Sequence, residues 1–214
     1  MGYTTVVFDL DGTLTDSQVG IIASYQHALA AYGISADAAS IIPWIGPPLS
    51  DGFAGLGVPA NEIKTAIETY RAYFAKVGIY QNRLYNGITD ALADLRRAGV
   101  SMAVATSKLT EFAEGIVAHF KIAGYFDVVA GASRDGTRVA KKDIVASALD
   151  KLGWPDPATV ALVGDRADDM SAAVHFGLFP VGASWGYGNV GELESAGSQV
   201  VLEDPAGLIS TLLV

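Results

Sequence analysis

Two carboxylates follow the first apolar segment of the chain, two positions apart. Residues 6–8 are Val, Val and Phe, a composition typical of a buried strand, and they lead directly into Asp9, Leu10 and Asp11. Because side chains of an extended strand alternate in direction, Asp9 and Asp11 are expected to project to the same side. Two carboxylates placed together repel each other unless they share a cation. We therefore hypothesise that the pair holds a divalent cation and attacks a phosphoryl group.

Further polar residues stand where later apolar segments end. They are Thr106 and Ser107 after residues 100–105, Asp165 and Asp169 after residues 159–163, and Lys141 at the start of a helical pattern between these two segments. In a parallel sheet the carboxyl ends of the strands meet at one edge, where ligands bind beside the point at which the strand order reverses. These side chains are therefore expected to reach the same edge as Asp9 and Asp11.

The pattern from residue 80 onward predicts the elements that position these residues. Apolar strands alternate with helices of about ten residues, which is typical of an α/β fold with a Rossmann-like, doubly wound and mainly parallel sheet. After residues 6–8, strands are expected at 100–105, 126–130, 159–163, 179–181 and 199–202, and helices at 88–98, 109–120, 142–152, 167–176, 192–196 and 205–213.

The segment between the first strand and residue 80 has a different pattern. It shows helical periodicity at 19–32, 37–42 and 61–77, with no strand-like stretch between residues 16 and 79. The sequence therefore predicts a small all-α domain of residues 17–80, inserted into an α/β core of residues 1–16 plus 81–214. Thr15 and Asp16 lead directly into the inserted helices and are a candidate hinge.

Composition narrows the classes of function. The 214 residues are 50% hydrophobic with a mean hydropathy of +0.33, enough for one sizeable core. A net charge of -9 without a basic run argues against nucleic acid as a partner, and the absence of cysteine excludes disulfides and thiolate chemistry. No apolar run has the roughly 20 residues needed to span a bilayer, and no signal segment is visible. A soluble, cytoplasmic protein without a membrane partner is expected, and the sequence does not indicate its oligomeric state.

Taken in order, these motifs resemble those of the haloacid dehalogenase superfamily, in its phosphatase branch. The matching segments are DLDGT at residues 9–13, VATS at 104–107, an isolated lysine on a later loop and GDRADD at 164–169. The inserted helices look like the helical cap of that superfamily. Three further segments, IGPPL at 45–49, LYNGI at 84–88 and WGYG at 185–188, resemble the phosphoglycolate phosphatase and 5′-nucleotidase subgroup.

The resemblance implies catalytic and metal-binding roles. Asp9 would be the nucleophile that forms an aspartyl phosphate, and Asp11 the general acid and base. Magnesium would bind the Asp9 carboxylate, the Asp11 backbone carbonyl and Asp165, an all-oxygen set suited to a hard cation. Asp169 would orient the metal ligands without binding the ion directly, or would act through a water molecule. The family spacing GDxxxD favours Asp169 over the adjacent Asp168.

The resemblance also implies which residues grip the phosphate. The hydroxyl of Thr106 or Ser107 would bind the transferring phosphoryl oxygens, together with a lysine. Lys141 and Lys142 are adjacent, and Lys141 is favoured because it lies two residues before Asp143.

The implied function is a magnesium-dependent phosphomonoester hydrolase that acts on a small phosphorylated metabolite. A phosphoglycolate phosphatase-like activity is favoured by IGPPL, and a 5′-nucleotidase-like activity by the segment DGTRVAKKD at 135–143. A sugar phosphomutase and a catalytically silent binding protein of the same fold are the alternatives, whereas dehalogenation is disfavoured because dehalogenases of this superfamily lack the second aspartate of DLDGT. The segment GYGNVG at 186–191 formally matches a dinucleotide fingerprint, but only one further strand is expected after it.

Overall fold

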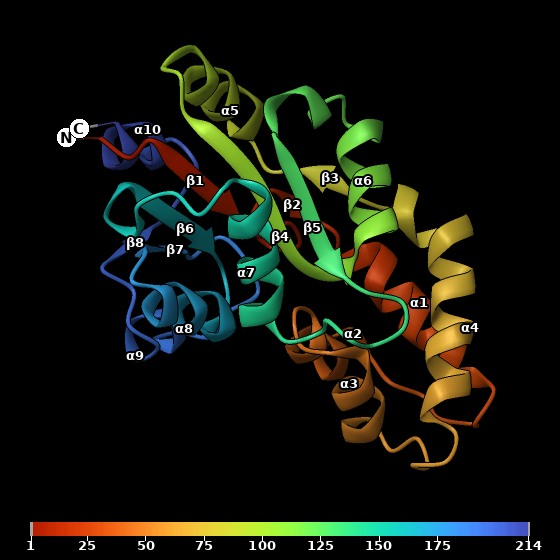
Figure 1. Cartoon of the computed structure of the whole chain (residues 1–214). Coiled ribbons are helices and arrows are strands. Elements are labelled where there is room, and N and C mark those ends of the chain that lie inside the picture. The colour runs from red at the N-terminus through yellow and green to blue at the C-terminus, as the bar shows by residue number, and fades with distance from the viewer. Residues whose placement is uncertain (1, 214) are drawn as a thin grey trace. The chain divides into compact units, whose positions relative to one another are not determined.

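The computed structural model describes residues 2–213 and contains a six-stranded sheet (Figure 1). The strands lie in the order β5-β4-β1-β6-β7-β8, and every neighbouring pair is parallel. Their bounds are Thr5–Phe8 (β1), Ser101–Leu109 (β4), Val128–Ala132 (β5), Val160–Gly164 (β6), Phe179–Ala183 (β7) and Val200–Leu202 (β8). The chain first builds outward on one side of β1 and then on the other, so the strand order reverses at β1. The predicted doubly wound, mainly parallel α/β fold is confirmed.

Helices cover both faces of this sheet, as right-handed crossovers in opposite directions require. They are α5 (Ile88–Arg97), α6 (Thr110–His119), α7 (Lys141–Lys151), α8 (Ala167–Phe176), α9 (Glu192–Ser195) and α10 (Gly207–Leu212). Helix α7 packs on β4, β5 and α8, and α8 packs on β6 and β7. Strands β1 and β6 are buried along their whole length, which is why they read as continuous apolar runs in the sequence.

The chain divides into two compact units. One contains the chain up to Thr15 and from Leu84 onward, and the other is Asp16–Arg83. The second unit holds α1 (Gln18–Ala30), α2 (Ala38–Ile41), α3 (Leu49–Gly55) and α4 (Ile63–Lys76), with 3₁₀ turns at Ile42–Trp44 and Gly78–Tyr80. The expected boundaries were 17 and 80, and the assignment of residues 17–80 as an independent cap domain stays a prediction.

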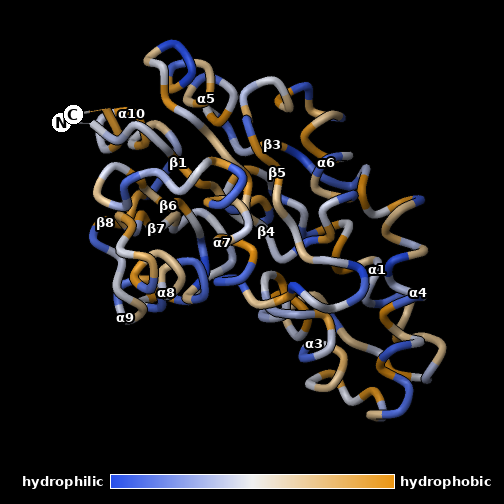
Figure 2. The backbone as a smooth tube through the Cα atoms, in the orientation of Figure 1, coloured by the Kyte–Doolittle hydropathy of each residue, from blue (hydrophilic) through white to orange (hydrophobic). Residues whose placement is uncertain are grey.

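Four aromatic side chains, Tyr25, Phe53, Tyr70 and Phe74, pack together inside the helical unit among aliphatic residues. The rings of Tyr25 and Phe53 are 4.9 Å apart between centroids, those of Tyr25 and Tyr70 are 5.0 Å apart, and Phe74 stacks on Tyr70 at 5.9 Å. Hydrophobic and hydrophilic segments alternate along α4 in Figure 2, as a helix with one buried face requires. No helix within residues 2–213 is both long and apolar enough to cross a membrane.

Three local features differ from the expected pattern. Helix α3 was not expected, because it directly follows a cluster of prolines and glycine; Pro48 precedes its first residue. No strand lies between residues 16 and 79, as expected, but a short pair at the two ends of this segment was not expected: β2 (Thr15–Asp16) and β3 (Arg83–Leu84) form a two-stranded sheet. Two-residue strands are too short to produce a periodic signal. Strand β4 also runs beyond the expected residue 105 to Leu109, with a register shift after Thr106.

Candidate active site

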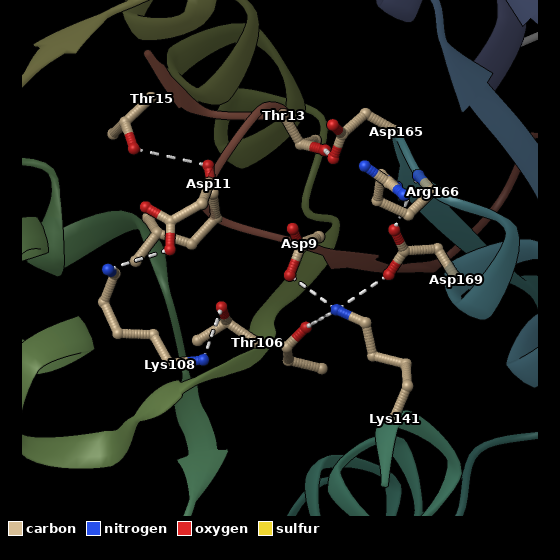
Figure 3. A network of polar contacts seen from close by, with 12 residues as sticks. Asp9, Asp11, Thr13, Thr15, Thr106, Lys108, Lys141, Asp165, Arg166 and Asp169 are labelled. Carbon is tan, nitrogen blue, oxygen red and sulfur yellow. Dashed lines mark hydrogen bonds and ion pairs between the residues drawn. The ribbon is translucent and has the colours of Figure 1, made fainter. Parts of the chain in front are cut away.

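The polar residues selected from the sequence gather at the carboxyl ends of β1, β4 and β6 (Figure 3). Asp9 directly follows β1, and its backbone N–H donates to the Val163 carbonyl at 2.9 Å, which continues the pairing with β6. Thr106 lies in β4, and Asp165 directly follows β6. The strand order therefore brings residues from distant parts of the sequence to the edge where the order reverses.

Lys141 is the cation of this cluster. Its Nζ lies 2.5 Å from Asp9 Oδ1, 2.7 Å from Asp169 Oδ1 and 2.9 Å from the Ala105 carbonyl oxygen. The neighbouring Lys142 is exposed on α7. Of the two lysines that the sequence left open, the structure therefore brings only Lys141 to the carboxylates.

Three buried carboxylates lie together here, and two of them, Asp9 and Asp169, contact this ammonium group. Oxygen atoms of Asp9, Asp165 and Asp169 all lie within 4.8 Å of one another. Burial raises the pKa of Asp9 to about 7 despite the opposing charge of Lys141, and burial together with Asp9 raises the pKa of Asp165 well above its usual range. Burial acts to lower the pKa of Lys141, but the carboxylates of Asp169 and Asp9 outweigh it and raise that pKa. The excess of negative charge and the all-oxygen donor set fit a hard divalent cation such as Mg²⁺.

Asp165 is held at both carboxylate oxygens. Thr13 Oγ1 donates to Oδ1 at 3.2 Å, and the Tyr187 backbone N–H donates to Oδ2 at 2.8 Å. Gly12 has a φ of +88°, and a Cβ at this position would lie 2.1 Å from Asp165 Oδ2. The turn after β1 therefore needs glycine both for its backbone conformation and for its close approach to this carboxylate.

Asp169 belongs to the first turn of α8 and faces the cluster, whereas the adjacent Asp168 is exposed. Besides its ion pair with Lys141, Asp169 accepts a hydrogen bond at Oδ2 from the Arg166 backbone N–H at 3.1 Å. The carboxylate thus caps the start of α8 while it orients the lysine.

The carboxylate of Asp11 does not belong to the group of three, Asp9, Asp165 and Asp169, that could hold a metal ion. The chain leaves the extended conformation after Asp9, because the Leu10 carbonyl accepts N–H bonds from residues 13–15 in a tight turn. Asp11 Oδ2 lies 3.0 Å from Lys108 Nζ, and Asp11 Oδ1 is buried without a hydrogen-bond partner among residues 2–213. Asp9 and Asp11 thus belong to different charge pairs, and the strand alternation expected from their spacing of two does not continue to Asp11.

Lys108 is the residue that the sequence pattern missed. Its side chain is only 7% exposed, and its backbone N–H donates to Thr106 Oγ1 at 3.3 Å. The register shift between Thr106 and Leu109 interrupts the alternation of side chains along β4. The direction of the Lys108 side chain therefore could not be predicted from its position in the sequence. Thr106 is buried, whereas Ser107 is half-buried and no hydrogen bond joins it to the cluster within residues 2–213.

Comparisons with known proteins identify the family. The model of the haloacid dehalogenase-like hydrolase family matches residues 6–183. Tyrosine-protein kinase PtkA of Mycobacterium tuberculosis is 42% identical over 197 residues, which cover 92% of this chain and 67% of that protein. A 5′-nucleotidase of Pseudomonas aeruginosa is 37% identical over 195 residues, which cover 90% of this chain and 88% of that protein.

A solved structure agrees with the sequence relatives. The crystal structure of a predicted phosphatase from Clostridium acetobutylicum superposes with a TM-score of 0.94 at 35% identity, and the match covers 100% of this chain and 99% of that one. These matches confirm the resemblance on which the enzyme class was predicted. The chain therefore belongs to the haloacid dehalogenase-like hydrolases.

Proposed function

We propose that the chain is a magnesium-dependent phosphomonoester hydrolase that acts on a small phosphorylated metabolite through an aspartyl phosphate at Asp9. The observation that carries this proposal is the placement of Asp9. It is buried at the end of the central strand, in contact with Lys141 and within 4.8 Å of Asp165 and Asp169. A nucleophile, a cationic partner and further oxygen ligands thus share one edge of the sheet.

The oxygen atoms at this site fit a Mg²⁺ ion. Asp9 and Asp165 would hold Mg²⁺ with their carboxylates and Asp11 with its backbone carbonyl, while Asp169 would keep Lys141 in place behind them. When bound, the ion supplies positive charge that neutralises the carboxylates and the transferring phosphoryl group.

Asp9 and Asp11 divide the chemistry between them. A carboxylate oxygen of Asp9 attacks phosphorus, and the bond from phosphorus to the leaving oxygen breaks. A proton from Asp11 Oδ1 goes to the leaving oxygen; this atom is free of protein hydrogen bonds within residues 2–213, whereas Oδ2 is occupied by Lys108. Asp11 then takes a proton from the water that attacks phosphorus, which releases inorganic phosphate and restores Asp9.

Thr106 and Lys141 are proposed to act on the transferring phosphoryl group. The hydroxyl of Thr106 lies at the edge of the sheet, and Ser107 is the adjacent candidate donor. Lys141 already contacts three oxygen atoms, so we infer that it orients Asp9 and supplies charge in addition to any direct phosphate contact.

Two substrate classes are proposed, with specificity residing in the cap of residues 17–80. The first class is a small phosphorylated acid such as phosphoglycolate, which the resemblance of the IGPPL segment at 45–49 supports. A nucleoside 5′-monophosphate is the second candidate, which the relative named 5′-nucleotidase supports at 37% identity.

Phosphate release tests the mechanism. The chain is expected to hydrolyse p-nitrophenyl phosphate with Mg²⁺ and to stop when EDTA is added. Asp9→Asn should lower kcat by at least about 10³-fold because it removes the nucleophile. Asp168→Asn is the matched control, since this exposed carboxylate is one residue from Asp169 and should leave kcat unchanged. Persistent turnover in a folded Asp9→Asn variant would contradict the mechanism.

A substrate panel then separates the alternatives. Phosphoglycolate, nucleoside monophosphates and sugar phosphates are ranked by kcat/KM, and ATP is included because one relative is named a tyrosine kinase. Conversion of a sugar phosphate to its isomer would indicate a mutase, and transfer of phosphate from ATP to protein would contradict hydrolysis as the reaction. A folded chain that binds phosphate esters without turnover under any divalent metal would be a silent binding protein.

A further inference from the structure

The loop that follows β7 passes directly over Asp165. A Cβ on Gly186 would lie 2.3 Å from Asp165 Cβ and 2.5 Å from the Gly12 carbonyl oxygen, and a Cβ on Gly188 would lie 2.3 Å from the Asp165 carbonyl oxygen. Only glycine allows the backbone to approach this closely. Packing against Asp165 thus explains Gly186 and Gly188 of the GYGNVG segment without a bound dinucleotide, whereas Gly191 has open space around its Cβ position and a positive φ of 76°.

This loop, residues 185–189, fixes both oxygen atoms of the Asp165 carboxylate. Tyr187 donates its backbone N–H directly to Oδ2 at 2.8 Å. Trp185 Nε1 donates to the Thr13 carbonyl at 3.0 Å, and Thr13 Oγ1 donates to Asp165 Oδ1 at 3.2 Å. A displacement of the 185–189 loop would therefore release one oxygen and loosen the support of the other.

Glu192, the first residue of α9, ties the 185–189 loop to the start of α8. Its Oε2 accepts from the Asn189 backbone N–H at 2.9 Å and from Asn189 Nδ2 at 3.2 Å. Its Oε1 accepts from the Ala167 backbone N–H at 2.8 Å and lies 3.0 Å from Arg166 Nε. Arg166 in turn donates from Nη1 to the Tyr187 carbonyl at 3.4 Å. The Glu192 carboxylate, which is 13% exposed, thus joins the 185–189 loop to residues 166–167, which directly follow Asp165 in the chain.

We propose that Glu192 is a positioning residue for the metal site, which acts by holding the 185–189 loop and, through it, the carboxylate of Asp165. The inference rests on the proposed function, because it takes Asp165 as a ligand of Mg²⁺. Residues that orient metal ligands from outside typically change metal affinity by about 10–100-fold when they are replaced. The Glu192 carboxylate contacts Asn189, Ala167 and Arg166 rather than the proposed metal ligands. Its loss should therefore raise the Mg²⁺ dissociation constant while kcat at saturating Mg²⁺ is largely retained.

Calorimetric titration of the full chain with magnesium chloride tests this proposal. Glu192→Gln keeps the size of the side chain but removes the charge and the acceptor capacity of one oxygen, and should weaken Mg²⁺ binding by about tenfold or more. Glu194→Gln is the matched control, because Glu194 lies on the same short helix and is exposed. The Mg²⁺ concentration for half-maximal phosphate release should rise by the same factor in Glu192→Gln, whereas a purely structural defect would lower kcat at every Mg²⁺ concentration.

The outcomes separate this inference from the proposed function. Unchanged Mg²⁺ affinity in a folded Glu192→Gln variant overturns the role of Glu192, whatever the activity. Weakened Mg²⁺ binding in a chain that releases no phosphate supports the inference and contradicts only the proposed function. Absence of Mg²⁺ binding in the wild type overturns both. If Glu192→Gln does not fold, Glu192→Asp tests the same role, because the shorter side chain keeps the charge but cannot reach Asn189 and Ala167 together, and it should weaken Mg²⁺ binding in the same direction.

Discussion

Replacing Lys141 with methionine tests the charge balance of the site. Methionine keeps most of the apolar stem but removes the ammonium group that lies 2.5 Å from Asp9 and 2.7 Å from Asp169. The three side chains are 7%, 7% and 1% exposed, so water cannot replace the lost partner. Loss of one partner from a buried ion pair costs about 3–5 kcal/mol of stability. For a chain of this length, that loss corresponds to a decrease in Tm of roughly 6–20 °C.

The assay is denaturant unfolding at neutral pH with EDTA, repeated with Mg²⁺. In EDTA, Lys141→Met should lose about 3–5 kcal/mol, because nothing replaces the positive charge. Magnesium should restore part of the stability, because a ligand that binds only the folded state stabilises it and because the ion brings positive charge to the same carboxylates. Phosphate release should also fall steeply, since Asp9 loses its orientation.

Lys142→Met is the matched control, because Lys142 is the next residue on α7 and is exposed. It should stay within about 0.5 kcal/mol of the wild type. Equal stability of Lys141→Met and Lys142→Met in EDTA would refute the conclusion that one ammonium group compensates the buried carboxylates.

Two further substitutions test the turn after β1 and the core of the helical unit. Gly12→Ala should destabilise the chain by about 1–3 kcal/mol beyond the cost of its positive φ and should weaken Mg²⁺ binding, because its Cβ would overlap Asp165. Gly33→Ala is the control, since Gly33 also has a positive φ of 66° but open space around its Cβ, and similar unfolding and calorimetric results for the two variants would contradict the steric explanation. Tyr25→Phe should be at least as stable as the wild type at neutral pH, because the Tyr25 hydroxyl is buried without a hydrogen-bond partner among residues 2–213. Burial raises the pKa of Tyr25, so the wild type loses stability as the pH rises above the unfolded value of about 10, and the advantage of Tyr25→Phe should grow by about 1.4 kcal/mol per pH unit there. Unfolding measured at neutral and alkaline pH checks this, with Tyr80→Phe at an exposed position as the control; parallel loss of stability in Tyr25→Phe and the wild type would count against it.

Most of the fold could be predicted because buried parallel strands and amphipathic helices leave different periodic signals. Helix α8 was expected at 167–176 and occupies the same residues, and β1 and β6 were located by their continuous apolar runs. Elements without such a signal were missed. Helix α3 is short and follows prolines, and the β2–β3 pair has two residues per strand, so neither presents a repeated pattern.

The sequence by itself determined which residues could meet, because parallel strands bring their carboxyl ends to one edge. Asp9, Thr106 and Asp165 were placed at the ends of their strands by local pattern alone, and the tertiary structure brings Asp9 and Asp165 together. The resemblance of the motifs supplied the family, which the comparisons confirm.

Only the tertiary structure decided between adjacent side chains. Neighbouring residues on a helix with 3.6 residues per turn point about 100° apart, so only Lys141 of the lysine pair and Asp169 of the aspartate pair can face the cluster. The register shift in β4 directs the Lys108 side chain toward Asp11. Close packing brings the 185–189 loop against Asp165, where the Tyr187 backbone N–H donates to its carboxylate. These choices depend on distances across the sheet between residues far apart in the chain, and local sequence patterns carry no information about such distances.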